Sequence, residues 1–295
     1  ILSRFVMKMI RPIVNIGKII EPYEAVIVGF NGVLTDGNGI AADAVNALVE
    51  MKKRGKHIVL CSNTCMRVAA LCDFLIADKV PLKLFDAVIT AGEILHYKLK
   101  SRSQECASLG TAYYKLGSCR DMGIFSGLDY QPVDDISLAD FVYMDSAASA
   151  DDIIDKYLPE LEHAAGLGLP FVCAGNDTSS YKDGKISLAP GALAEQYAVL
   201  GGKIITVGKP DPVVMAYCLE ALPQGIAKEK ILVIGDNLAT DIKGANLAGF
   251  DSVLISKGVH VNFLGEGYIS DVTKTRELSM SIDAYPDYVI SGLRW

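Results

Sequence analysis

Short apolar runs alternate with longer amphipathic segments along the first third of the chain. The runs at residues 25–30, 57–61 and 87–90 are mostly apolar, as expected of strands that are buried on both faces. Between them, residues 43–54 and 66–77 place apolar side chains at helical spacing. This alternation predicts an α/β fold with a doubly wound parallel sheet and helices on both of its faces.

The same rhythm returns in the last third of the chain. A helix is predicted over residues 212–222, and four strand-like runs are expected to complete the first sheet, at 204–207, 231–234, 253–255 and 288–290. This last third and the first third therefore belong to one core domain, for which we predict residues 1–93 and 196–295.

The middle of the chain has a rhythm of its own. A helix is predicted over residues 150–165, and short strands are predicted at 111–116, 141–144 and 170–174. We therefore predict that residues 94–195 form a smaller α/β domain that is inserted into the core domain.

The first twenty residues carry no targeting signal that we recognise. Residues 5–20 have a loose helical spacing and precede Pro22, so a short leading helix is predicted. Basic side chains interrupt every apolar stretch there, whereas a secretory signal needs about 7–15 uninterrupted apolar residues. No run in the chain approaches the ~18 apolar residues of a membrane span. We expect a cytoplasmic protein that does not contact a membrane.

Composition narrows the function only slightly. The chain has 295 residues, of which 51% are hydrophobic and 21% are charged, as in an ordinary globular protein. Its formal net charge of -7 argues against nucleic acid as a partner. The seven cysteines include no Cys-x-x-Cys pair, and we predict that they are small buried apolar residues rather than ligands or a redox pair.

Polar loops follow four of the predicted strands, where a parallel sheet places its ligands. The first loop runs from Gly29 to Gly37. In the second, Ser62 and Asn63 are suited to holding a phosphoryl oxygen at a helix N-terminus, although Ser-Asn-Thr is also a common helix cap. In the third, Lys209 lies between Gly and Pro and is suited to neutralising phosphate, but it also fits a surface turn.

The fourth loop is the most specific of the set. Asp236 follows an apolar strand directly, and Asp241 comes five residues later. Carboxylates at a strand end suit a hard cation such as Mg²⁺, with Asp236 as a ligand and Asp241 fixing the loop or the outer shell of the metal. Both residues also fit a plain role at the start of a helix, where a carboxylate interacts favourably with the helix dipole.

In order and spacing, these four loops resemble the four motifs of the haloacid dehalogenase (HAD) superfamily. The long insertion between the second and third motifs resembles the cap domain of its class IIA, NagD-like phosphatase branch. Further likeness lies in residues 88–92, 175–177, 190–192 and 244–249. The resemblance implies a Rossmann-like core, a cap, a Mg²⁺ site and a phosphate site, and a small phosphorylated metabolite or inorganic phosphate as the ligand.

The first motif departs from the family pattern. The position of the nucleophilic aspartate is Gly29, and the position of the acid/base aspartate is Asn31. Glycine cannot form an aspartyl phosphate, and Asn31 cannot exchange a proton near neutral pH, although its carbonyl group could still contribute to a weakened metal site. Asp36 is the best local substitute for the nucleophile, but Asp36-Gly37 is explained equally well by a tight turn.

Two functions therefore stay open at this point. One is a protein without catalysis that retains a phosphate site at Ser62, Asn63 and Lys209, with or without Mg²⁺, for binding, sensing or regulation. The other is a Mg²⁺-dependent hydrolase of a small phosphomonoester that uses Asp36 or a metal-bound water. In either case the resemblance implies that the cap selects the ligand, with Asn176 and Asp177 as candidate contacts and a β-turn as the alternative. Self-association through the cap is also possible in this branch.

Overall fold

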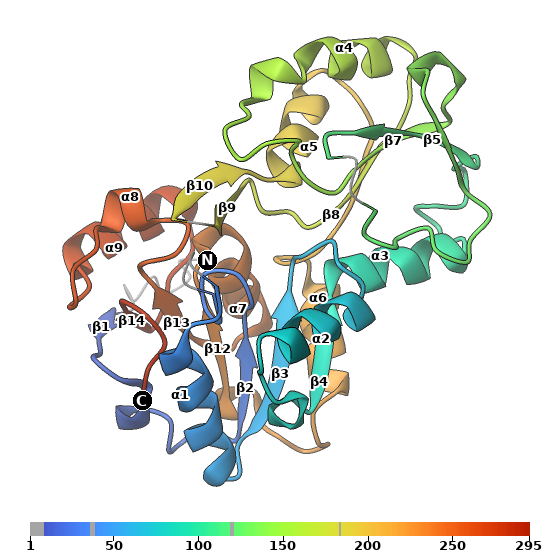
Figure 1. Cartoon of the computed structure of the whole chain (residues 1–295). Coiled ribbons are helices and arrows are strands. Elements are labelled where there is room, and N and C mark those ends of the chain that lie inside the picture. Colours follow the sequence, from blue (N-terminus) through green and yellow to red (C-terminus); the bar gives the residue numbers. More distant parts are fainter. Residues whose placement is uncertain (1–8, 36–38, 119–120, 183) are drawn as a thin grey trace, which may run out of the picture.

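The computed structural model describes residues 9–35, 39–118, 121–182 and 184–295. Its core domain contains a seven-stranded sheet with the order β1-β14-β13-β12-β2-β3-β4 (Figure 1). Every neighbouring pair in this sheet is parallel. The strands are β1 (Arg11–Pro12), β2 (Ala25–Val28), β3 (His57–Ser62), β4 (Ala87–Thr90), β12 (Ile231–Gly235), β13 (Asp251–Ile255) and β14 (Tyr288–Ile290).

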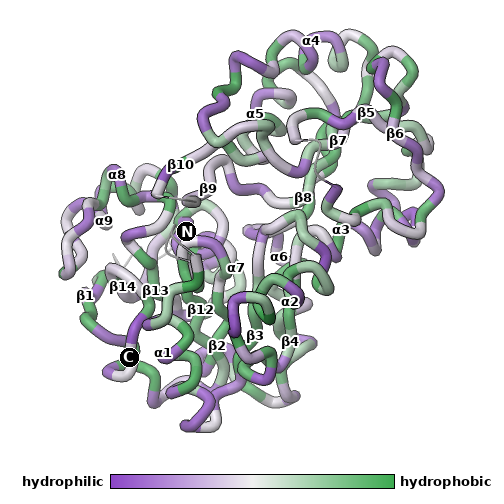
Figure 2. Tube along the Cα trace, viewed as in Figure 1, coloured by the Kyte–Doolittle hydropathy of each residue, from purple (hydrophilic) through white to green (hydrophobic). Residues whose placement is uncertain are grey.

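Helices cover both faces of this sheet, because alternate side chains of each strand point to opposite sides. Ala25 and Ile27 of β2 pack toward α6 and α7, whereas Val26 and Val28 pack toward α1 and α2. Hydrophobic residues are concentrated along the central strands (Figure 2). The helices of the core are α1 (Ala42–Lys53), α2 (Val68–Ala77), α3 (Ala91–Lys100), α6 (Pro212–Glu220), α7 (Lys243–Ala248), α8 (Val261–Leu264) and α9 (Val272–Ile282). The predicted doubly wound parallel fold is confirmed.

The cap contains a second parallel sheet, with the order β11-β8-β7-β5-β6. Its strands are β5 (Ala112–Leu116), β6 (Gln131–Val133), β7 (Phe141–Met144), β8 (Phe171–Ala174) and β11 (Ile204–Val207). Two helices, α4 (Leu158–Gly166) and α5 (Pro190–Val199), pack on one face of this sheet, and α3 packs on the other face. An antiparallel hairpin of β9 (Ser179–Lys182) and β10 (Lys185–Leu188) extends from the cap toward the core (Figure 1).

Three predicted elements need correction. The prediction that residues 204–207 continue the core sheet is wrong, because β11 pairs with β8 in the cap. The leading helix is also wrong within the described residues 9–20, where Arg11–Pro12 adds a short strand beside β14 and Ile16–Lys18 forms one 3₁₀ turn. The helix predicted over 150–165 begins only at Leu158, with Pro159 in its first turn.

Short turns complete the described part of the chain. The 3₁₀ turns beyond Ile16–Lys18 are Leu82–Leu84, Ile136–Leu138, Ile154–Lys156 and Lys228–Lys230, and a π-helical turn spans Leu238–Ile242. Among the residues described, no helix has the length and apolar character of a membrane-spanning segment.

Candidate functional site

The first loop leaves β2 beside the end of β12. The Gly29 N–H donates to the carbonyl of Ile234 over 2.8 Å. A Cβ atom added to Gly29 would lie 3.1 Å from Cγ2 of Val33 and 3.8 Å from Oδ1 of Asp241. A side chain at this position would therefore enter the pocket with a small shift of one methyl group. Asn31 is exposed and lines the same pocket, and Asp36, the proposed substitute nucleophile, lies outside the described residues.

Gly32, in the same loop, is required by close packing against the fourth loop. Its φ of +68° favours glycine, and a Cβ atom there would lie 2.0 Å from Oδ2 of Asp236. Gly258 approaches the same oxygen from another segment, with a distance of 2.2 Å for an added Cβ. The Val259 N–H donates to that oxygen over 2.9 Å. Backbone thus surrounds one oxygen of Asp236 and fixes its side chain.

Lys209 reaches from the end of β11 into the core. Its Nζ donates to Oδ1 of Asp241 over 2.6 Å and to the carbonyl of Cys61 over 2.8 Å. Asn63 holds the backbone of Lys209, since its Oδ1 accepts the Lys209 N–H at 2.7 Å and its Nδ2 donates to the Lys209 carbonyl at 3.0 Å. Both polar atoms of the Asn63 amide are therefore engaged in positioning Lys209, and direct contact of Asn63 with phosphate stays a prediction.

Asp241 organises the fourth loop from the π-helical turn. Its Oδ2 accepts the N–H groups of Asp236 and Asn237, each at 3.1 Å, while its Oδ1 pairs with Lys209. Two side chains fix the start of that turn. Asn237 is its N-cap, and Nε2 of His260 accepts a hydrogen bond from the Leu238 N–H at 3.0 Å. Both carboxylate oxygens of Asp241 accept hydrogen bonds from other groups of the chain, so Asp241 holds the fourth loop in its conformation.

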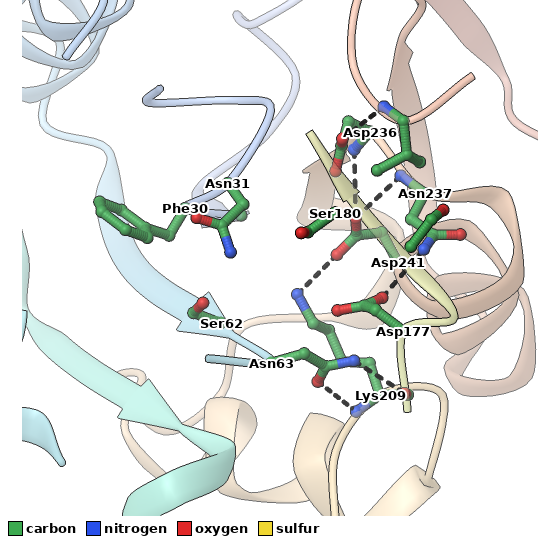
Figure 3. A pocket seen from close by; sticks show the side chains of 13 residues that line it. Phe30, Asn31, Ser62, Asn63, Asp177, Ser180, Lys209, Asp236, Asn237 and Asp241 are labelled. Carbon is green, nitrogen blue, oxygen red and sulfur yellow. Dashed lines mark hydrogen bonds and ion pairs between the residues drawn. The ribbon is translucent and has the colours of Figure 1, made fainter. Parts of the chain in front are cut away.

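Ser62 ends β3 on the opposite side of the pocket. Its Oγ accepts the Thr64 N–H over 3.1 Å, a local turn contact. The side chain is buried and lines the pocket with Asn31. In Figure 3 dashed lines connect Asn63, Lys209, Asp241, Asp236, Asn237 and Asp177, whereas none reaches Ser62 or Asn31.

The cap supplies a carboxylate to the same pocket. Oδ1 of Asp177 accepts hydrogen bonds from Oγ1 of Thr240 at 2.6 Å and from Nδ2 of Asn237 at 2.9 Å. These bonds join this cap residue to the core. The neighbouring Asn176 instead holds the return segment, with Nδ2 donating to the carbonyl groups of Gly208 and Lys209 at 2.9 and 3.2 Å. Of the two predicted cap contacts, only Asp177 lines the pocket.

Burial and mutual repulsion shift the ionisation of these groups. Burial, followed by the charge of Asp241, raises the pKa of Asp236 well above its usual range, and the same two causes raise the pKa of Asp177. Burial is the largest single influence on Lys209 and would lower its pKa, but the charges of Asp241, Cys61 and Asp177, together with the hydrogen bond to Asp241, raise that pKa. Burial lowers the pKa of His260 to about 4, consistent with a neutral ring whose Nε2 accepts a hydrogen bond.

The resulting cavity is small, about 30 Å³. A buried water needs roughly 10–15 Å³, so the cavity has room for two or three waters. The residues that line it are Gly29, Phe30, Asn31, Ser62, Asn63, Asp177, Ser179, Ser180, Lys209, Asp236, Asn237, Asp241 and Val259. The structure thus brings Gly29, Asn31, Ser62, Asn63, Lys209, Asp236 and Asp241, which come from all four loops, together in one pocket.

Comparison with known proteins identifies the family of this chain. A family model described as haloacid dehalogenase-like hydrolase matches residues 23–249, and a second, described as HAD-hydrolase-like, matches residues 206–294. The chain belongs to the haloacid dehalogenase-like hydrolase family.

Individual HAD proteins agree with this assignment. A haloacid dehalogenase-like hydrolase from Brucella suis 1330 superposes with a TM-score of 0.78 at 26% identity, over 95% of this chain and 98% of that one. The 4-nitrophenylphosphatase of Thermotoga maritima, 22% identical, gives a TM-score of 0.62 over 92% of this chain and 95% of that one, and so confirms the fold of the nitrophenylphosphatase-like branch. Dihydroxyacetone phosphatase of Corynebacterium glutamicum is 32% identical over 93 residues, which span 31% of this chain and 33% of that protein.

The HAD resemblance implies Mg²⁺ beside Asp236, but the donor set fits a resident ion poorly. Oδ2 of Asp236 is occupied by the Val259 N–H, and both oxygens of Asp241 are engaged within the chain. Gly29 offers no side chain. Within the described residues, no three His, Cys, Asp or Glu side chains are grouped to hold a metal ion. Asp236 is left as a single carboxylate ligand with one available oxygen, so waters or other groups would have to supply most of the octahedral shell of Mg²⁺.

Proposed function

We propose that this HAD-family protein binds phosphate or a small phosphorylated metabolite without hydrolysing it through an aspartyl phosphate. The observation that carries this proposal is Gly29. Gly29 lines the pocket at the position where the family pattern places a nucleophile. A Cβ atom added to it would lie 3.8 Å from Oδ1 of Asp241. Loss of such a nucleophile typically lowers the rate by several orders of magnitude.

The carboxylates that remain are poorly placed to substitute for it. Asp241 is paired with Lys209, Asp177 is bound by Thr240 and Asn237, and Asp236 accepts the Val259 N–H. A nucleophile needs a free, oriented oxygen and a partner that manages the proton. These hydrogen bonds favour binding roles for the three carboxylates.

The binding roles follow the four loops. Ser62 and Lys209, with Asn63 positioning the lysine, would contact the phosphate, while Asp236, Asp241 and Asn31 would form the wall of the pocket on the side of the first and fourth loops. From the cap, Asp177 and the β9 residue Ser180 would face the rest of the ligand. The phosphatases named above suggest a small phosphorylated metabolite as the ligand class. A cytoplasmic location and self-association stay predictions.

Phosphomonoester hydrolysis with Mg²⁺ tests this proposal, using wild type and the Asp36→Asn and Asp236→Asn variants. We expect no turnover by any of the three, together with a rise in the Tm of wild type when phosphate and Mg²⁺ are added. Asp73→Asn, an exposed change on α2, is the matched control. If wild type hydrolyses the substrate and either Asp36→Asn or Asp236→Asn abolishes this activity, the proposal is overturned in favour of a rearranged hydrolase.

A further inference from the structure

A second cleft lies at the amino end of the core sheet, away from the candidate functional site. β3 begins at His57, which lines this cleft, and ends at Ser62, which lines the pocket described above. A strand of this length spans roughly 17 Å, so the two sites lie at opposite ends of the sheet (Figure 1). The cleft has a volume of about 730 Å³, within the range of about 300–1,000 Å³ that is typical of ligand sites.

The titratable side chains that line this cleft are all basic. Four lysines and one histidine take part, and the described lining contains no aspartate or glutamate. Lys52 and Lys53 belong to the last turn of α1, where basic side chains stabilise the helix dipole. That role does not explain the others, because Lys56 and His57 follow the helix and Lys83 comes from a separate 3₁₀ turn. In a chain with a formal net charge of -7, this lining favours an anionic ligand.

Neighbouring carboxylates neutralise only part of this charge. Lys52 pairs with Asp86 at 2.7 Å, and their side chains are 24% and 31% exposed. Lys53 pairs with Glu50 at 2.7 Å, with 65% and 23% exposure. Partly exposed pairs of this kind contribute at most about 1 kcal/mol, so an anion can compete for these lysines. Lys83 is exposed and has no carboxylate partner among the described residues.

Lys56 adds a positive charge that is almost buried. The residue is 8% exposed, and its Nζ donates to the carbonyl groups of Glu21 and Tyr23 over 3.0 and 2.7 Å. An ammonium group has three donors, so these bonds leave one donor without a partner in the described chain. A buried charge that only neutral groups surround is costly, and a bound anion would offset that cost.

Apolar side chains form another part of the wall. Val49 of α1 lines the cleft together with Pro81 and Leu84. Gly55 has a φ of +71°, and a Cβ atom added to it would meet no atom within 4 Å, so the space beside it is open. Ammonium groups beside an apolar surface suit a ligand that joins several negative charges to a ring.

We propose that this cleft binds a nucleoside polyphosphate, with the phosphates at Lys53, Lys56 and Lys83 and the base against the apolar wall. The cleft is separate from the pocket of the four loops, and the proposal does not depend on what that pocket binds. A neutral nucleoside lacks the charges that the lysines require, and inorganic polyphosphate lacks the ring.

Isothermal titration calorimetry of the full chain with ATP in the presence of a chelator tests this proposal. We expect ATP to bind, with an affinity that falls as NaCl is added, because salt screens exposed charges. Adenosine should bind at least about tenfold more weakly, and tripolyphosphate more weakly than ATP. Wild type that does not bind ATP, or that binds tripolyphosphate as tightly as ATP, would overturn the inference.

A charge reversal locates the bound nucleotide. Lys83→Glu should lower the affinity for ATP at least about tenfold. Lys203→Glu makes the same chemical change at an exposed site before β11 and should match wild type, and circular dichroism confirms that both variants are folded. A folded Lys83→Glu variant that binds ATP like wild type would overturn the inference.

Chemical protection locates the nucleotide without a substitution. Lysines are acetylated briefly with and without ATP and then identified by mass spectrometry. We expect ATP to protect Lys53 and Lys83 but not Lys203. Bound ATP that protects neither Lys53 nor Lys83 would place the nucleotide elsewhere and overturn the inference, while leaving the proposed function intact.

Discussion

The two sides of the pocket differ in how firmly their side chains are held. On the β12 side, Asp241, Lys209 and Asp177 each make at least two hydrogen bonds within the chain. On the β2 side, Gly29 has no side chain and Asn31 is exposed (Figure 3). The side chains beside β12 are thus held by hydrogen bonds within the chain, whereas the β2 side, where the proposed function places the altered reacting group, has no such network.

This difference has a structural explanation. Lys209 ties the return segment from the cap to Cys61 of β3 and to Asp241, and Asn63 fixes its backbone. These contacts join the two domains and the sheet, so the fold requires them whether or not a reaction takes place. The Gly29 position has no comparable partner, which allows it to change without loss of structure.

Restoring the reacting side should have the largest effect. In a Gly29→Asp/Asn31→Asp variant, the new Cβ at position 29 would contact Val33 at 3.1 Å and point toward the Asp241 side of the pocket. We expect phosphomonoesterase activity with Mg²⁺ at least about a hundredfold above wild type, because a nucleophile and an acid/base group return together. Asn31→Asp alone should stay inactive. A folded double variant without activity would mean that the other loops have also lost their catalytic geometry.

Removing the buried ion pair between Lys209 and Asp241 should lower the stability of the protein. Lys209→Met leaves the buried Asp241 carboxylate without its cation, and we expect the free energy of unfolding to fall by about 3–5 kcal/mol in urea titrations. Lys209→Met/Asp241→Asn should recover part of this loss, because the uncompensated charge is gone. A Lys209→Met variant as stable as wild type would contradict the structural role of the pair.

Acid should destabilise the folded protein through protonation of His260. Burial lowers the pKa of His260 to about 4, below about 6.5 in the unfolded chain. The unfolded state therefore binds more protons as the pH falls from about 6.5 toward 4, and the stability due to the neutral ring is lost over that range. By proton linkage, wild type should lose about 2 kcal/mol between about pH 7 and about pH 5 through this residue. Urea unfolding of His260→Gln should lack that component, and identical pH profiles for both proteins would contradict the assignment.

The smallest effect is expected at an exposed ion pair. Lys243 pairs with Asp283 at 2.8 Å, but their side chains are 29% and 69% exposed. Lys243→Met should change the free energy of unfolding by less than about 1 kcal/mol. Measured beside Lys209→Met, it separates the burial of the charge from the loss of a lysine.

The sequence predicted six of the seven strands of the core sheet, all but β1, and the convergence of their loops. Apolar runs identify strands, and the carboxyl ends of parallel strands meet at one edge, so Ser62 and Asp236 could be placed together. Periodicity does not choose a strand's partner, and for that reason β11 was assigned to the wrong sheet. The loose apolar spacing of residues 5–20 suits either a helix or a short strand, and in the described part Arg11–Pro12 pairs with β14.

Parts of the site depend on contacts that no local pattern reveals. Ser179, Ser180 and Asn237 line the cavity, but they were not predicted as site residues, because their place follows from how the β9–β10 hairpin approaches the core. Polar residues just after Asp177 were the available signal. The two hydrogen bonds between the Asn63 side chain and the Lys209 backbone could not be predicted either, because they join residues that are 146 positions apart in the sequence.

The central claim is that this pocket binds a phosphate ester and does not cleave it. Phosphorus NMR of 4-nitrophenyl phosphate with excess wild-type protein and Mg²⁺ observes both events in one sample. We expect the ester resonance to shift or broaden and no inorganic phosphate resonance to appear over hours. An ester resonance unchanged by the protein, or inorganic phosphate that accumulates with wild type but not with Asp236→Asn, would contradict the claim.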